Sequence, residues 1–223
     1  MILIPVKNSS AAKQRLATVL DQPSRTKLAQ AMLYDVLTAL HEWKDRPPIA
    51  VVTSDPYAVQ LATEYQFEVI ADPENPGETG AIEMATRLCV ERGISWTLVI
   101  PADIPLIQTS ELEEILRRAP KQGSVLVPAG DRRGTNAAFR RPADLFSLRF
   151  GNDSFEPHQA AAQATGKPCV VLEFPSIAVD VDNPADLQQL ISLPGDTRSQ
   201  RLARRLTARV ATGTSPIEND SQP

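Results

Sequence analysis

An aspartate follows a short apolar run near the middle of the chain and stands between two prolines. The run ends at Ile100, and Pro101-Ala102-Asp103-Ile104-Pro105 follows it. Apolar and β-branched residues in such a run predict a buried strand, and open α/β sheets bind ligands at the carboxyl ends of their strands. Because proline continues neither a strand nor a helix, the turn that carries Asp103 is stiff. Asp103 is therefore a candidate metal ligand, and an ordinary turn aspartate is the alternative.

A second acidic segment, residues 177–182, repeats the pattern of an apolar strand that runs into carboxylates. Alternate residues of an extended chain point to one side, so Asp180 and Asp182 are expected to face the same way. Asn183-Pro184 then has the form of a helix start. Mg²⁺ binds hard oxygen ligands and completes its coordination with water and phosphates. We expect Asp103 and Asp182 to share one Mg²⁺ ion, with Asp180 as a third candidate ligand.

A basic loop follows the first predicted strand. Lys7, Lys13 and Arg15 lie within a short stretch of it, and no glycine-rich phosphate-binding motif is present. Backbone amides alone are therefore not expected to hold phosphates, and the three cations could supply the charge instead. The alternative for this segment is a solvated basic loop.

Three further loops combine glycine with small polar side chains. Residues 72–80 form a turn-rich loop that enters a helix, where Gly77 and Gly80 let the backbone approach a ligand. The other two are Gly134-Thr135-Asn136 and the segment of residues 150–158, which contains Gly151, Ser154 and His158. Single polar loops are usually only loops, but several of them beside two aspartate-tipped strands favour a binding site.

The composition narrows the class of protein. The chain has 223 residues, a formal net charge of −4 and 42% hydrophobic residues, as in one globular α/β domain. It offers no basic field for nucleic acid, and no apolar stretch reaches the roughly 20 residues of a membrane span. Residues 1–7 do not resemble a secretory signal, and Cys89 and Cys169 lack metal-ligand spacing. We expect a cytoplasmic protein with free thiols that binds neither nucleic acid nor membranes.

Short apolar segments alternate with longer segments of helical period along residues 1–193. Strands are predicted at residues 3–6, 49–53, 67–70, 97–100, 124–128 and 169–174, and helices at 24–42, 56–65, 80–91 and 110–118. This alternation predicts an α/β fold with a mainly parallel sheet and helices on both faces.

Residues 194–223 differ from the rest of the chain in composition. Their apolar content is lower, and an amphipathic helix is predicted to carry Arg198, Arg201, Arg204, Arg205 and Arg209. We expect a solvated, partly disordered tail, because so few apolar side chains do not offset the entropy lost on ordering. Contact of a basic helix with nucleic acid or a membrane is one alternative, and docking on a second subunit in a homodimer is another.

Taken in order, these motifs resemble one family. They are Ile4-Pro5-Val6-Lys7 with Lys13 and Arg15, Pro76-Gly77, Pro101-Ala102-Asp103-Ile104-Pro105-Leu106, Gly134-Thr135-Asn136, Phe150-Gly151 with Ser154-Phe155 and His158, and Asp180-Val181-Asp182. The pattern is similar to that of the 2-phospho-L-lactate or phosphoenolpyruvate guanylyltransferases of deazaflavin coenzyme biosynthesis. The resemblance covers about residues 1–192 and is most specific from Gly134 to His158.

The resemblance implies a single Rossmann-like sheet of the glycosyltransferase-A type, with a nucleotidyltransferase domain at residues 1–193. It also implies Mg²⁺-dependent transfer of GMP from GTP to the phosphate of a small phospho-carboxylate, with release of pyrophosphate. The acceptors implied are phosphoenolpyruvate, 2-phospho-L-lactate and 3-phosphoglycerate, which share a carboxylate and a phosphate.

The same resemblance assigns roles to residues. Asp103 and Lys13 would be catalytic, and Asp103, Asp182 and Asp180 would hold the metal. The GTP-binding set would be Pro5, Lys7, Lys13, Arg15, Gly77 and Gly80, and the acceptor-binding set would be Thr135, Gly151 and Ser154. For His158 two roles stay open, a structural histidine that caps a helix and a side chain that faces the ligand.

Two other functions compete with this one. A nucleotidyltransferase that acts on a sugar phosphate or on the molybdenum cofactor would use the same aspartates, but relatives that load molybdopterin carry a glycine-rich loop after the first strand. A non-catalytic nucleotide-binding domain could share the fold, but it would have no use for both metal aspartates.

Overall fold

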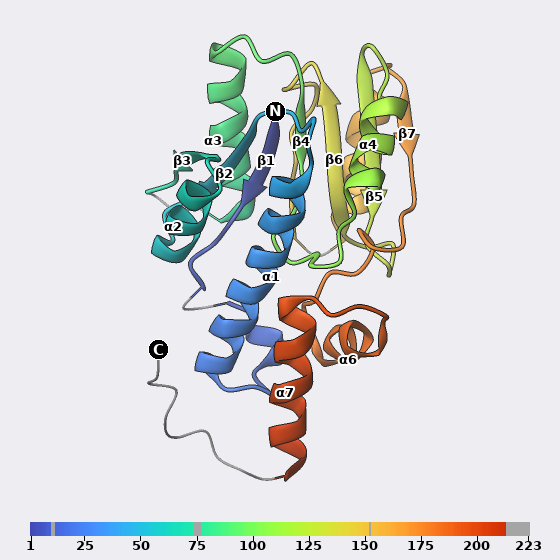
Figure 1. Ribbon diagram of the computed structural model, residues 1–223. Coiled ribbons are helices and arrows are strands. Elements are labelled where there is room, and N and C mark those ends of the chain that lie inside the picture. The colour runs from blue at the N-terminus through green and yellow to red at the C-terminus, as the bar shows by residue number, and fades with distance from the viewer. Residues whose placement is uncertain (10–11, 74–76, 152, 213–223) are drawn as a thin grey trace.

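A sheet of seven strands crosses the described part of the chain in the order β3-β2-β1-β4-β6-β5-β7 (Figure 1). The computed structural model describes residues 1–9, 12–73, 77–151 and 153–212. The strands are β1 (Ile2–Pro5), β2 (Ile49–Thr53), β3 (Glu68–Ala71), β4 (Thr97–Val99), β5 (Gly123–Pro128), β6 (Thr135–Arg141) and β7 (Cys169–Val171). Only the pairs that β6 makes with β4 and β5 are antiparallel within this part of the chain. The expected mainly parallel α/β sheet is confirmed.

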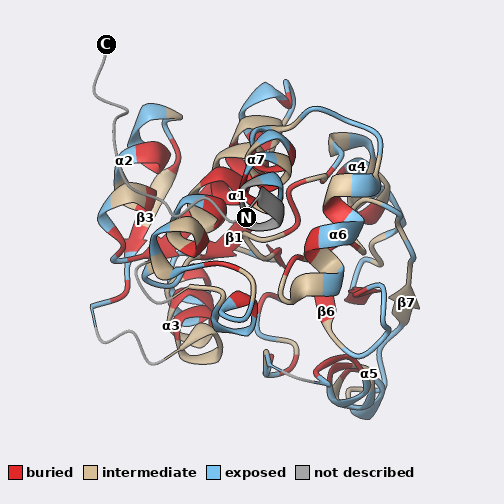
Figure 2. Cartoon of the chain, turned by 90° about the horizontal axis from the view of Figure 1, so that it is seen from below, coloured by how far each residue is buried: buried red, intermediate tan, exposed pale blue. Residues whose placement is uncertain are grey.

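Helices cover both faces of the sheet (Figure 2). They are α1 (Gln22–Glu42), α2 (Pro56–Glu64), α3 (Glu78–Glu91), α4 (Thr109–Arg118), α5 (Phe155–Ala164), α6 (Pro184–Ser192) and α7 (Arg198–Thr212), with a short 3-10 helix, η2 (Gln14–Leu16). The helices α1, α2 and α4 pack on one face with Ile2 and Ile4 of β1. The helices α3 and α5 pack on the other face with Leu3. The side chains of β1 therefore alternate between two cores, as the period of a strand requires.

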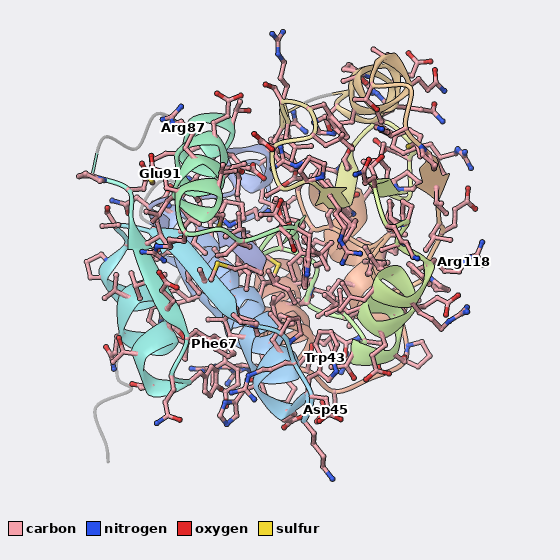
Figure 3. All side chains as sticks on the ribbon, turned by 90° about the horizontal axis from the view of Figure 1, so that it is seen from above. Trp43, Asp45, Phe67, Arg87, Glu91 and Arg118 are labelled. Atoms are coloured by element: carbon pink, nitrogen blue, oxygen red, sulfur yellow. The ribbon has the colours of Figure 1, made fainter. Side chains whose placement is uncertain are left out.

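The helices that follow parallel strands begin at one edge of the sheet and end at the other. Asp55 caps α2, because its Oδ1 accepts a hydrogen bond from the Ala58 amide at 2.9 Å. Asn183 and Asp186 form a capping box at the start of α6. Figure 3 shows the opposite edge, where Trp43 and Asp45 follow the end of α1. The carboxyl edge therefore carries strand ends and helix starts together, which is where a site is expected.

Three segments differ from the elements that the sequence predicts. Thr135 and Asn136, expected in a polar loop, begin strand β6, and residues 155–158 of the second expected loop form the first turn of α5. The apolar stretch before Asp180 was expected to be a strand, but it is not one. Ile177 is buried there, and the Val181 amide donates to the Asp103 carbonyl oxygen at 3.1 Å. The segment is therefore fixed by buried side chains and by hydrogen bonds to other loops of the same chain, including that of the Gly130 amide to the Ala178 carbonyl, rather than by a strand ladder.

The arginine-bearing helix α7 packs on its own chain, which differs from the expected solvated tail. Ala203 and Leu206 are buried in a third apolar cluster with Leu28 of α1 and Leu190 of α6. Asp35 of α1 accepts hydrogen bonds from the first amides of α7 at 3.0 and 2.8 Å. The apolar residues lie on one face of α7, so their small number still suffices for docking. No helix in the described residues has the length and apolar character of a membrane span.

Removal of α7 is therefore expected to destabilise the protein. A chain that ends at Leu193 loses Ala203 and Leu206 and leaves the apolar faces of α1 and α6 open to water. We expect its melting temperature to fall by about 5 °C or more, from the lost burial of apolar surface. A chain that ends at residue 212 keeps α7 and serves as the control. Equal melting temperatures for the two shortened chains, measured by calorimetry, would contradict the packing role of α7.

Candidate active site

A cleft of about 1310 Å³ opens at the carboxyl edge of the sheet. It is lined by the loop after β1, the turn after β4, the start of α3 and the segments before α5 and α6. Most of the predicted site residues line it: Pro5, Lys7, Lys13, Arg15, Gly77, Asp103, Thr135, Gly151, Ser154, Asp180 and Asp182. Gly80 does not line the cleft; it is the third residue of α3. Residues 74–76 of the predicted loop lie outside the described part of the chain.

The ammonium group of Lys13 lies between two of the predicted metal-binding aspartates. Its Nζ is 2.6 Å from Oδ2 of Asp103 and 2.8 Å from Oδ1 of Asp182. Lys13 precedes η2 with a φ of 55°, in the left-handed region. The hydrogen bond from the Val181 amide to the Asp103 carbonyl brings the two acidic segments together beside it. Three segments distant in sequence thus bring three charged groups to one point.

The charges of this group shift one another's protonation equilibria. Burial alone would lower the pKa of Lys13, but the nearby Asp103 and Asp182 carboxylates raise it above its usual value. Burial of Asp182 would raise the pKa of that carboxyl, but the charge and the hydrogen bond of Lys13 lower it below its usual value. At neutral pH the lysine is therefore an ammonium and Asp182 is a carboxylate.

Asp180 is turned to a different partner. One of its carboxylate oxygens accepts a hydrogen bond from Nδ2 of Asn136 at 3.0 Å, and the same amide donates to the Ile177 carbonyl. Burial raises the pKa of Asp180 to about 6, with the charges of Asp103 and Asp182 acting in the same direction against the hydrogen bond from Asn136. Among the described residues no three histidine, cysteine or acidic side chains form a group that could hold a metal ion.

The donor set fits a cation held by two carboxylates. Asp103 and Asp182 each direct one oxygen to the same atom, so their oxygens converge on a point where a cation already lies. Two hard oxygen donors with room for phosphate and water are the pattern typical of Mg²⁺ sites. Asp103 and Asp182 are therefore the residues that could hold a metal, while one oxygen of Asp180, which lines the same cleft, accepts from Asn136.

The start of α3 places in the cleft a carboxylate, that of Glu78, which was not predicted from the sequence. Glu78 lies 3.7 Å from the ammonium group of Lys7, and Gly77 precedes it with a φ of 90°. Burial raises the pKa of Glu78 to about 7, with a further rise from Asp103. The N-terminal amides of α3 face the same region, and the acidic residue that follows a Pro-Gly pair at a helix start was the available signal.

Asp55 also lines the cleft and was not predicted. Its Oδ2 accepts from the amide and the hydroxyl of Ser9, each at 2.8 Å. Because its other oxygen caps α2, Asp55 ties the basic loop after β1 to the end of β2. The Asp-Pro pair after an apolar run was the signal, and it indicates a structural rather than a reacting carboxylate here.

Two hydroxyl groups also line the cleft. Thr135 begins β6 and Ser154 precedes α5, and their oxygens are 3.3 Å apart. Both residues are buried, yet both line the cleft. Gly151 has a φ of 139° and no atom within contact distance of a Cβ there, so its backbone is open to the cleft. The geometry brings together the three residues predicted to bind one ligand.

His158 lies behind these hydroxyls and takes neither of the two roles left open by the sequence. Its Nδ1 is 2.9 Å from Oγ1 of Thr135, and its Nε2 accepts the Arg149 amide at 2.8 Å. The side chain is buried in α5, so it neither caps a helix nor faces the ligand directly. Burial, with the charge of Arg140 as a smaller cause, lowers its pKa to about 4.

The low pKa of His158 predicts an acid-dependent loss of stability. Because the pKa is about 4 in the folded state against 6.5 in the unfolded state, the stabilisation is complete above pH 6.5 and is lost as the pH falls toward 4. The free energy of unfolding should fall by about 2–3 kcal/mol more in the wild type than in His158→Gln between pH 7 and pH 4. Urea unfolding at the two pH values measures it, with exposed His41→Gln as control. Parallel losses in all three proteins would contradict the assignment.

Comparison with known proteins gives the family. Residues 1–220 match the family model described as "Guanylyl transferase CofC like". A phosphoenolpyruvate guanylyltransferase of Sphaerobacter thermophilus is 33% identical over 84% of this chain and 90% of its own. A 2-phospho-L-lactate guanylyltransferase of Methanothermobacter thermautotrophicus is 30% identical over 99% and 98%, respectively. A 3-phospho-D-glycerate guanylyltransferase of Colwellia psychrerythraea is 32% identical over 86% and 91%.

A solved structure agrees with the fold. The crystal structure of a putative nucleotide-diphospho-sugar transferase from Desulfovibrio desulfuricans G20 superimposes with a TM-score of 0.74 at 19% identity. The match covers 95% of this chain and 96% of that one, so the two proteins share an architecture. At this low sequence identity the match is evidence for the fold alone. With the sequence match over nearly the whole length, the chain belongs to the CofC-like family of guanylyltransferases.

Proposed function

We propose that this guanylyltransferase moves GMP from GTP to the phosphate of a small phospho-carboxylate. The observation that carries the proposal is the cleft itself. In this cleft Lys13 meets Asp103 and Asp182, and Thr135 and Ser154 contribute hydroxyl groups to the same lining. The charged group suits the phosphates of a nucleotide, and the pair of hydroxyl groups suits a second, smaller anion.

The proposed reaction does not need a general base. A phosphate oxygen of the acceptor forms a bond to the α-phosphorus of GTP, the bond from that phosphorus to the bridging oxygen breaks, and pyrophosphate leaves with the electron pair. The attacking oxygen is already anionic near neutral pH, so the barrier lies in bringing two polyanions together in line. Positive charge at the reacting phosphates is therefore the main requirement.

The side chains of the basic loop would supply that charge. Lys7, Lys13 and Arg15 line the cleft along one edge and would bind the triphosphate. Asp103 and Asp182 would hold Mg²⁺, which when bound supplies positive charge at the phosphates and polarises them. Lys13 would then be free of its two aspartates and available to the phosphate oxygens. Gly77 and the first amides of α3 would bind a further phosphate oxygen.

Thr135, Ser154 and Gly151 are proposed to bind the acceptor. Hydroxyl and backbone N–H groups suit a carboxylate and a phosphate, which are the groups shared by the acceptors named in the three relatives. A hydrogen bond between the loop of Gly151 and the start of α3 supports one joint site for the acceptor and the nucleotide. The Phe150 amide donates to Oγ1 of Thr79 at 3.0 Å, so the Gly151 loop is tied to the start of α3.

The loop of residues 72–80 is the proposed place of guanine recognition, because it leads into α3, whose start lines the cleft.

The selectivity for nucleotide and acceptor is tested directly by the choice of substrates. The protein is incubated with Mg²⁺ and each of the four ribonucleoside triphosphates. The acceptor is phosphoenolpyruvate, 2-phospho-L-lactate, 3-phosphoglycerate or a sugar phosphate, or it is left out. We expect pyrophosphate only with GTP and a phospho-carboxylate together. Release with a sugar phosphate, or with no acceptor, would contradict the proposal.

A further inference from the structure

Three hydrogen bonds lead from the backbone before α5 to the two hydroxyls of the cleft. The Arg149 amide donates to Nε2 of His158 at 2.8 Å. Nδ1 of His158 lies 2.9 Å from Oγ1 of Thr135. The hydroxyls of Thr135 and Ser154 are 3.3 Å apart. These groups are connected in a single line that ends at the cleft.

The first of these bonds fixes the tautomer of the imidazole. A backbone N–H is always a donor, so Nε2 of His158 must be the acceptor and carries no proton. The neutral ring then carries its proton on Nδ1, and Nδ1 donates to the Thr135 oxygen. Burial and the neighbouring Arg140 keep the ring neutral, in agreement with this assignment. A neutral ring with the opposite tautomer would set two N–H groups, those of Arg149 and Nε2, against each other.

The direction of the second bond decides how many hydrogens the hydroxyls can offer to a ligand. When Nδ1 donates, the Thr135 oxygen accepts, and the Thr135 hydrogen is not used on the ring. When Nδ1 accepts instead, the Thr135 hydroxyl donates its hydrogen to the ring and cannot donate it to a ligand in the cleft. The His158 tautomer therefore makes one more hydroxyl hydrogen available at a surface that lines the cleft.

We propose that His158 is a positioning residue which directs a hydroxyl hydrogen of the Thr135–Ser154 pair toward the bound acceptor anion. The inference rests on the proposed role of this part of the cleft as the acceptor site. An anion accepts hydrogen bonds and donates none. Its binding is therefore strengthened by a hydroxyl whose hydrogen points to it and weakened by a hydroxyl that presents its oxygen lone pairs instead. No contact between His158 and the substrate is required.

A purely structural role is the competing explanation, because His158 also supports the loop that carries Gly151. Its ring packs edge-on against Phe150, with 5.3 Å between the ring centroids, and its Nε2 holds the Arg149 amide. Two substitutions separate the roles. His158→Gln can keep an acceptor for the Arg149 amide but has no donor at the Nδ1 position. His158→Asn can keep a donor near that position but no longer reaches the amide.

Steady-state kinetics with each variant test the proposal. For His158→Gln we expect the acceptor KM to rise about tenfold or more, as for loss of a hydrogen bond to a charged group, with the GTP KM within about twofold of wild type. For His158→Asn we expect an acceptor KM closer to wild type, even if its melting temperature is lower. Equal increases in both variants, or in neither, would overturn the proposal, and so would a matching rise in the GTP KM. His41→Gln, at the far end of α1, is the control for general effects.

A second measurement needs no variant of His158 and no turnover. The chain has two histidines, so ¹⁵N imidazole spectra of wild type and His41→Gln assign the His158 signals directly. We expect a neutral ring protonated on Nδ1 at pH 7. A ring protonated on Nε2, or on both nitrogens, would overturn the inference even if every variant unfolds. Because this measurement does not depend on catalysis, it is separate from failure of the proposed function, which would show as absence of acceptor-dependent pyrophosphate release in the wild type.

Discussion

Asp103→Asn is expected to leave the fold intact and to lower kcat by about 100-fold or more. Asparagine keeps the size of the side chain and can still accept a hydrogen bond, so the turn between the two prolines should persist. The neutral amide binds a divalent cation more weakly than the carboxylate does, so less positive charge would be held at the reacting phosphates, and electrostatic stabilisation usually contributes most to catalysis there. Pyrophosphate release and circular dichroism are measured on the same preparation.

A matched substitution controls for the loss of one charge. Asp45 is an aspartate at the edge opposite the cleft, beyond the end of α1 (Figure 3). Asp45→Asn changes net charge by the same amount as Asp103→Asn and should keep kcat within about twofold. A folded Asp103→Asn protein with turnover near that of Asp45→Asn would remove Asp103 from the catalytic site.

Lys13→Met should separate metal affinity from turnover. The lysine ammonium and a Mg²⁺ ion would use the same oxygens of Asp103 and Asp182, so the two compete for one place. Without the ammonium, two carboxylates face each other, and we expect the apparent Mg²⁺ affinity to rise about tenfold. In the same protein kcat should fall by about 100-fold or more, because the charge proposed to contact the phosphates is gone.

Thermal shift in a Mg²⁺ titration measures the first effect, and pyrophosphate release measures the second. Methionine has about the length of lysine, so packing changes are small. Lys7→Met is the comparison, because the ammonium of Lys7 pairs with Glu78 rather than with the two aspartates. A Lys13→Met protein with unchanged Mg²⁺ affinity would show that the lysine does not occupy the metal position, and normal turnover would show that its charge is not needed.

The elements with a strong hydrophobic period could be predicted from the sequence. Residues 49–53 form β2 as expected, and residues 56–64 form α2 after an Asp-Pro start. Asp103 lies at the carboxyl edge because a buried apolar run and a proline turn are both local signals. The positions of Lys7, Thr135 and Ser154 around one cleft also agree with the predicted loops, since loops that follow neighbouring strands meet at one edge.

Features that depend on distant contacts could not be predicted. The place of Lys13 between Asp103 and Asp182 results from three loops and from a backbone conformation that lysine rarely adopts. The start of strand β6 was interpreted as a loop because Gly134-Thr135-Asn136 has turn composition. The strand that begins at Thr135 lies between β4 and β5 and pairs antiparallel with both. The docking of α7 depends on an apolar face that α1 and α6 leave open, which local composition does not reveal.

Transfer of a labelled phosphate tests the central claim most directly. The protein is given Mg²⁺, a phospho-carboxylate, and GTP labelled on either the α- or the γ-phosphate, with Asp103→Asn as the inactive reference. The account predicts that the α-label joins the acceptor through a new phosphate–phosphate linkage and that the γ-label leaves as pyrophosphate. A γ-label that appears on the acceptor, or an α-label that stays on free GMP, would contradict it.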